Sequence, residues 1–151
     1  MNIDWESLRT IAKQCWQHAE DKGFHEGDAD ILALADSIPD PHTQETLRAL
    51  AKRPGIGMRL ALIHSKVSEA LEAFRNPAWH PQRTYYKNIL GEETQEYREG
   101  VKGEGLATEL ADIVIRVFDL SGSLGIDIAE EIRRKMDYNA TRSYRHGGKR
   151  A

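Results

Sequence analysis

The chain has 151 residues, of which 40% are hydrophobic and 30% charged, a composition typical of a single globular domain. A formal net charge of −3 disfavours nucleic acid as a partner. The single cysteine, Cys15, excludes an intramolecular disulfide, and the N-terminal sequence lacks the pattern of a signal peptide. No apolar segment approaches the roughly 20 residues that a membrane span needs. We therefore expect a cytoplasmic protein that binds neither nucleic acid nor a membrane.

Helical periodicity dominates the chain and strand-type alternation is nearly absent, so the sequence predicts an all-α protein. Asp4, Thr43 and Asp127 stand where helices are expected to begin, as candidate N-caps. Glu130 follows Asp127 as in a capping box. The breaker sequence RPGIG at 53–57 predicts an interruption, and loop-like segments are expected before residue 43 and, with one or two short helices, between 76 and 104. The predicted helices are, in chain order, 4–22, 43–52, 57–76, 104–124 and 127–139.

The helix predicted over 104–124 is apolar around most of its circumference but carries one polar line within about 80° of the helical wheel. A helix of this kind is buried, and carboxylates beside a core need a partner or a cation. Glu109 and Asp112, at i and i+3, can direct both carboxylates at one point. A solvated stripe, or an ion pair of Asp112 with Arg116, explains the line equally well. The line consists of Glu109, Asp112, Arg116, Asp119 and Ser123.

The helix predicted over 57–76 carries a second acidic pair, Glu69 and Glu72, on the side away from its apolar face. Alone, such a pair is typical of solvated charge. Two helices that each carry an acidic i,i+3 pair can nevertheless gather four carboxylates around a hard divalent cation. The pattern thus indicates a Mg²⁺ site, with Mn²⁺ as the alternative ion, at Glu69, Glu72, Glu109 and Asp112.

A third element, KMDYNATR at 135–142, places Lys135, Asn139 and Arg142 on one helix face. Cationic donors beside a carboxylate–metal centre are what a triphosphate requires. The same residues also suit a helix C-terminus, followed by a basic tail over 143–151.

These three elements, in this order, resemble the MazG-like members of the all-α nucleoside triphosphate pyrophosphatase superfamily, which includes dimeric dUTPases and phosphoribosyl-ATP pyrophosphohydrolases. ELAD at 109–112 and KMDYNATR at 135–142 match two of the family's elements, and the join SGSLGIDI is also similar. The resemblance covers about 57–149, while DKGF is the most similar piece of the first 56 residues. It implies a four- or five-helix bundle in one domain over 1–151, with a core at about 57–142, a helical extension at 1–56 and the basic tail.

The resemblance also implies a function: metal-dependent hydrolysis of a (deoxy)nucleoside triphosphate to the monophosphate and pyrophosphate. The implied oligomer is a homodimer or homotetramer with sites near subunit interfaces. Aromatic side chains from 79 to 86 could stack on a base, although packing suits them as well. The implied catalytic residues are Glu69, Glu109 and Asp112; Glu72 joins them as a metal ligand, and the substrate-binding residues are Lys135, Asn139 and Arg142. The aromatic candidates are Trp79, Tyr85 and Tyr86.

Lys66 departs from the family pattern. The sequence HSKVSEALEA resembles the family stretch in which an acid usually stands at this position. A protonated lysine repels a divalent cation and cannot bind one. An alternative is therefore a catalytically impaired MazG-like module that binds nucleotides or partners. A di-iron bundle would need a Glu-x-x-His spacing, which the sequence lacks, and a nucleic-acid binder would have to rely on the basic tail.

Overall fold

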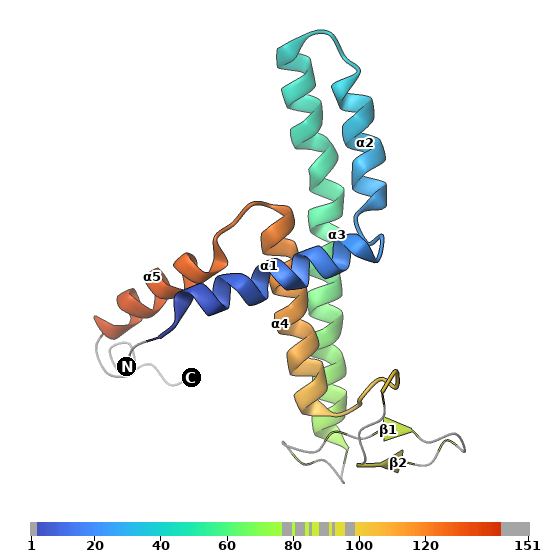
Figure 1. Cartoon of the computed structure of the whole chain (residues 1–151), viewed down its shortest axis with the longest axis vertical. Helices are drawn as coiled ribbons and strands as arrows, with labels where there is room; N and C mark the ends of the chain where they lie inside the picture. Colours follow the sequence, from blue (N-terminus) through green and yellow to red (C-terminus); the bar gives the residue numbers. More distant parts are fainter. Residues whose placement is uncertain are drawn as a thin grey trace.

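The computed structural model describes residues 3–76, 80, 84, 86–87, 91, 93–95 and 99–142. This part of the chain is all-α apart from one short strand pair, as the sequence predicts. Figure 1 shows α3 and α4 side by side, α2 along the other half of α3, and α1 crossing α4 to form an arm with α5. No described helix is both long and apolar enough to span a membrane. The elements are α1 Trp5–Asp21, α2 Glu26–Asp36, α3 Pro41–Arg75, β1 Tyr86–Lys87, β2 Glu93–Thr94, α4 Leu106–Ser123 and α5 Ile128–Ala140.

Three helices begin at an aspartate whose carboxylate accepts a hydrogen bond from a backbone amide three residues later. Asp4 and Asp127 do so for α1 and α5, which confirms the predicted caps. The cap of α3 is Asp40 and not Thr43. Pro41 follows Asp40 at the first helical position, where its missing amide costs nothing, so this pair is the stronger start signal.

Helix α3 runs unbroken through RPGIG, so the prediction of an interruption there was wrong. A proline removes one helical hydrogen bond but has a backbone φ that a helix accepts. Helix α2 packs along this half of α3, and tertiary packing can outweigh a local preference. Helix α2 itself occupies a segment predicted as loop-like, which was also wrong. Between 76 and 104, the described residues contain the antiparallel pair β1–β2, with Tyr86 opposite Thr94.

The buried core of one chain is small. Where α1 crosses α4, Gly122 lies directly beneath the Trp16 side chain, and a Cβ at that position would lie 2.5 Å from two Trp16 atoms. This crossing sets the angle at which the arm leaves α4. The buried apolar residues are Ala12, Ala35, Ala70, Phe118, Leu120 and Ala129.

We predict that Gly122→Ala lowers the free energy of unfolding by about 1–3 kcal/mol, because its methyl group overpacks the crossing with Trp16. Urea denaturation measures the change. Gly57→Ala is the matched control: it lies within α3 with nothing inside 4 Å of its added Cβ. It should raise the free energy of unfolding by up to about 1 kcal/mol. Equal effects of the two substitutions would mean that the crossing is not tightly packed.

Candidate active site

The side-chain ammonium of Lys66, on α3, lies among three carboxylates. Its Nζ is 2.6 Å from Glu69 Oε2, 3.2 Å from Glu109 Oε2 and 3.2 Å from Asp112 Oδ2. An ammonium has three hydrogens to donate, which matches the three acceptors. Residues from α3 and α4, more than 40 positions apart in the chain, thus meet at one cationic atom. We call these four residues the carboxylate cluster.

The helix periodicity explains how the cluster forms. Lys66 and Ala70 lie one turn apart and are the buried residues of the α3 face that packs on α4. Glu69 stands at the edge of this face. On α4, Glu109 and Asp112 are also about one turn apart, so the predicted convergence of their carboxylates occurs.

The cluster is partly removed from solvent. The Lys66 and Glu109 side chains are only 11% and 8% exposed. Charges this deeply buried are costly unless they are paired. Glu109 has a second cation, because Lys102 Nζ lies 3.4 Å from its Oε1. Lys102 is 58% exposed and therefore contributes less than Lys66.

The charges in the cluster shift the pKa values of their neighbours. The hydrogen bond to Glu69, followed by those to Asp112 and Glu109, raises the pKa of Lys66 above its ordinary 10.5 despite its burial. The hydrogen bond from Lys66 lowers the pKa of Glu69 below 4.5. Glu69 therefore stabilises the fold above pH 4.5 and loses this effect as pH falls through its lowered pKa. Lys66 stabilises it below pH 10.5 and loses this effect only as pH rises through its raised pKa.

Glu72 does not join the cluster within one chain. It is 71% exposed, and its carboxylate accepts a hydrogen bond from Arg75 at 2.8 Å. Glu72 lies about 60° further around α3 than Glu69 does, away from α4. Of the four predicted metal ligands, the structure brings together Glu69, Glu109 and Asp112.

The predicted substrate-binding residues lie on α5, in the arm that projects from the α3–α4 pair (Figure 1). Lys135 Nζ and the Arg142 guanidinium carbon lie 5.5 and 5.8 Å from the centre of the Tyr138 ring, as cation–π pairs. Asn139 is exposed beside them. The structure leaves these residues apart from the carboxylate cluster of the same chain. Trp79, Tyr85 and the basic tail over 143–151 lie outside the described residues; Tyr86 is in β1.

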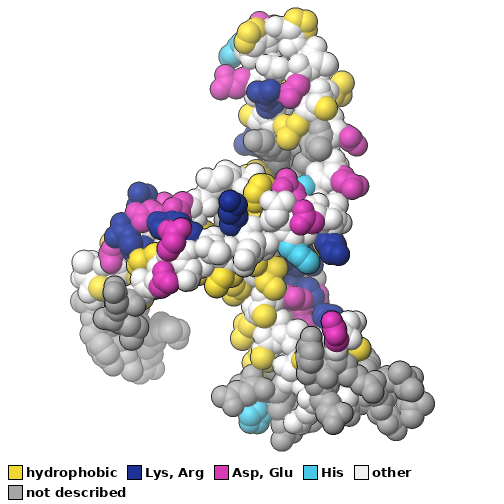
Figure 2. Space-filling model, viewed as in Figure 1, with side chains coloured by type: hydrophobic (Ala, Val, Ile, Leu, Met, Phe, Trp, Pro, Cys, Tyr) yellow, Lys and Arg dark blue, Asp and Glu magenta, His cyan; other side chains and the backbone are white. Residues whose placement is uncertain are grey.

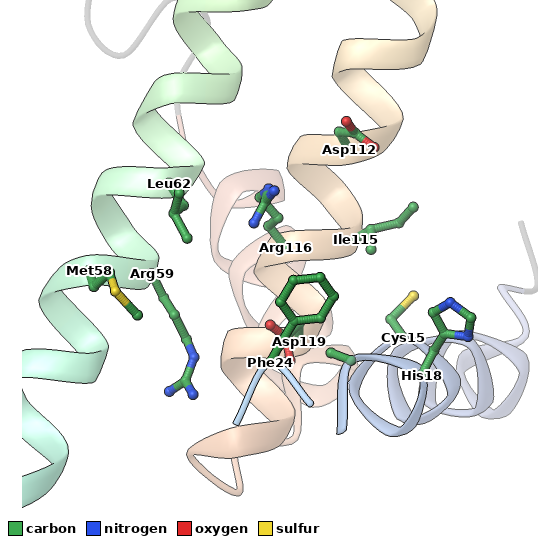
Figure 3. Close-up of a pocket in the computed structure, with 11 residues that line it drawn as sticks. Cys15, His18, Phe24, Met58, Arg59, Leu62, Asp112, Ile115, Arg116 and Asp119 are labelled. Atoms are coloured by element: carbon green, nitrogen blue, oxygen red, sulfur yellow. The ribbon is translucent and has the colours of Figure 1, made fainter. Parts of the chain in front are cut away.

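A cavity of about 200 Å³ adjoins the cluster and shares Asp112 with it. It lies between α1, α3 and α4, and Figure 3 shows Phe24, at the end of the loop after α1, among the α4 side chains Arg116 and Asp119. Sequence reasoning missed this cavity as a site. Its signals were Arg116 and Asp119 in the polar line of α4 and Phe24 in the DKGF sequence.

His25 connects three elements beside this cavity. Its Nε2 is 2.8 Å from Asp119 Oδ1 on α4, and Arg59 Nη2 on α3 is 2.8 Å from its Nδ1. A guanidinium can only donate, so Nδ1 accepts and Nε2 carries the hydrogen that is donated to Asp119. This chain of hydrogen bonds fixes the start of α2 against α3 and α4.

Comparison with protein-family models, curated proteins and solved structures finds no match for this chain. The site must therefore be interpreted from its own geometry. A divalent cation does not fit the cluster as it stands, because the Lys66 ammonium lies where the three carboxylates converge, within 3.2 Å of each. The chemistry available to the described cluster is that of one cation neutralising three carboxylates.

We predict that Lys66→Met lowers the free energy of unfolding at neutral pH by about 3 kcal/mol, because three carboxylates then face one another with only the exposed Lys102, among the described residues, paired to one of them. Chemical denaturation across a pH series measures this. The deficit should shrink below pH 4.5, where Glu69 becomes protonated and its share of the repulsion is lost.

Lys102→Met is the control for this substitution. It removes an exposed ammonium from the same Glu109 and should cost less than about 1 kcal/mol. A similar loss for both variants, or a deficit that grows in acid, would contradict the assigned role of Lys66.

Proposed function

We propose that this chain is a MazG-like nucleoside triphosphate pyrophosphohydrolase of the cytoplasm, whose carboxylate cluster is the hydrolytic site with Lys66 in the position of a metal ion. The reaction adds water across the bond between the α- and β-phosphates and yields a nucleoside monophosphate and pyrophosphate. The convergence of Glu69, Glu109 and Asp112 from two adjacent helices is the observation that carries this proposal. The order of the three sequence elements supports it.

Lys66 sets the resting state of the proposed site. Its raised pKa keeps it cationic at neutral pH, and its three carboxylate partners hold it in place. The Mg²⁺ that the family resemblance implies therefore competes with a tethered cation. We expect slow turnover for this chain, and faster turnover when the lysine is replaced by the acid of the family pattern.

A second candidate function is a MazG-like module that binds nucleotides or partners without turnover. The position of Lys66 favours it, because a cluster already neutralised by an internal cation has no need of an added one. The two candidates differ in one observable, the release of pyrophosphate.

We predict that Lys66→Glu raises the rate of pyrophosphate release in Mg²⁺ by roughly tenfold or more for at least one nucleotide of a dNTP and NTP panel. The substitution removes the ammonium and gives a hard cation an all-oxygen site. Pyrophosphate is assayed separately from orthophosphate. The double variant Lys66→Glu with Glu109→Gln is the control and should lose the gain. If neither the unaltered chain nor Lys66→Glu releases pyrophosphate from any nucleotide, the remaining function is the second candidate, a module that binds nucleotides or partners without turnover.

We also propose that the protein works as a homo-oligomer. Within the described part of the chain, several large apolar side chains of the α3–α4 pair are exposed, among them Val67, Leu71 and Leu110. Exposed apolar side chains that lie together are typical of an interaction surface. If Lys135, Asn139 and Arg142 bind the nucleotide held at a carboxylate cluster, they come from a second copy, because one chain keeps them on its arm.

The exposed apolar side chains of the α3–α4 pair support this pair as the surface that binds the second copy. The polar line of α4 faces its neighbours, while Leu110, Val114 and Ile115 are about half exposed. Figure 2 shows hydrophobic side chains gathered on the surface below the α1 arm. Apolar side chains that lie together on the surface of a protein are typical of interaction surfaces. On α3 the half-exposed stripe consists of Leu60, Val67, Leu71 and Phe74.

We predict that the double substitution Val67→Glu with Leu71→Glu lowers the oligomeric state, because it places carboxylates in the covered stripe. Sedimentation velocity measures the mass in solution. Ser68→Glu is the control, since Ser68 is exposed on α3 beside the stripe and the new charge is the same. A monomeric unaltered protein, or equal dissociation by Ser68→Glu, would show that this stripe is not the interface.

A further inference from the structure

The cavity beside the carboxylate cluster has apolar walls and a mouth that is open to solvent. Phe24 and Met58 stand at the mouth and are 71% and 57% exposed, although both are large apolar side chains. Its volume of about 200 Å³ is smaller than the roughly 300–1,000 Å³ of sites for whole drug-sized ligands. The cavity therefore suits a single flat ring system. The apolar walls are formed by Ala19, Phe24, Met58, Leu62 and Ile115.

Arg116 is a hydrogen-bond donor that lines this cavity. Its side chain is partly buried and extends from α4 towards α3 (Figure 3). Within the described part of the chain, its guanidinium has no hydrogen-bond or ion-pair partner. A guanidinium presents several N–H donors in a planar fork, and those of Arg116 that have no protein partner are open to solvent and thus available to a ligand. A ligand with two adjacent acceptor atoms would pair with this fork.

Acceptors are also available in the cavity. Asp112 uses Oδ2 for Lys66, and Asp119 uses Oδ1 for His25. Among the described residues, neither carboxylate has a side-chain partner for its second oxygen, so that oxygen can accept from a ligand. The cavity thus has apolar walls, a guanidinium that can donate two parallel hydrogen bonds, from Arg116, and carboxylate acceptors on the same helix.

We propose that this cavity binds a guanine base, with Arg116 donating to the base and a cavity carboxylate accepting from it. Guanine presents two adjacent acceptors, O6 and N7, which a bidentate arginine recognises, and an amino donor at N2. Adenine presents a donor beside N7 and so mismatches the fork. The flat faces of the base would lie against the apolar walls, with Phe24 at the mouth.

The position of the cavity connects the base to the cluster. Because Asp112 belongs to both, a nucleotide whose base fills the cavity would have its phosphates near the carboxylate cluster. The placement of the phosphates near the cluster rests on the proposed function. It makes the substrate of that function a guanine nucleotide. The base-binding step stands without it, because it uses neither Lys66 nor a metal.

Cys15 provides a direct probe of occupancy. It lines the cavity and is the one cysteine of the sequence, so thiol alkylation reports on this site alone. Burial, followed by the nearby Asp119, raises the pKa of its thiol, so the reaction is followed in alkaline buffer, where the thiolate forms. The experiment uses the full chain in EDTA and measures the iodoacetamide reaction rate against added GMP, AMP, CMP, UMP or inorganic phosphate.

GMP should slow alkylation of Cys15 at an about 5- to 150-fold lower concentration than AMP, as expected for one bidentate arginine–base pair. Arg116→Met should remove this preference, whereas Arg134→Met, an exposed arginine on α5, should keep it. Arg116→Lys should weaken it, since a lysine cannot pair two acceptors in one plane. If a variant fails to fold, the difference between GMP and AMP in protecting Cys15 of the unaltered chain still tests the proposal.

Equal protection by all four monophosphates would overturn the guanine assignment, and protection by inorganic phosphate alone would make Arg116 an anion site instead. Absence of any protection would remove the cavity as a ligand site. None of these results depends on pyrophosphate release, so the proposed hydrolysis can fail while base binding holds, and the reverse.

Discussion

The contact between the Lys66 ammonium and three carboxylates is the interaction on which the packing of α3 against α4 depends. Glu109 is almost fully buried, and Asp112 and Glu69 lie within 3.2 Å of the same cation. Without that cation, the two helices would bring three negative charges together in a partly buried site. The folded state would then lose several kcal/mol of stability. The positive charge that neutralises the three carboxylates is supplied by the chain itself, on a side chain anchored in α3.

The continuity of α3 gives the molecule its shape. One half of this helix packs against α2 and the other half packs against α4, while α1 crosses α4 at Gly122 and carries α5 away from the column. The polar line of α4 is turned towards these neighbours, and Leu110, Val114 and Ile115 are left half exposed, whereas Phe118 and Leu120 are buried. This distribution leaves an apolar stripe on the described surface of the α3–α4 pair.

Local signals predicted the parts of the structure that depend on neighbouring residues. The caps at Asp4 and Asp127 and the i,i+3 pair of Glu109 with Asp112 follow from spacing, and Lys66 stood out because of its charge. The unbroken α3, the helix α2 and the cavity depend on packing between distant segments, which spacing does not reveal. Glu72 met the literal acidic spacing, but the direction in which α3 faces α4 selects Lys66 and Ala70 instead.

The thermal unfolding midpoint, measured with and without Mg²⁺ in the unaltered protein and in Lys66→Glu, tests most directly whether Lys66 stands in for a divalent cation. A ligand that binds only the folded state stabilises it by RT ln(1 + [L]/Kd), so the midpoint keeps rising with the logarithm of ligand concentration above Kd. We predict that Mg²⁺ changes the midpoint of the unaltered protein little and raises that of Lys66→Glu progressively with its concentration. An equal increase in the unaltered protein, or no increase in Lys66→Glu, would contradict the assigned role of Lys66.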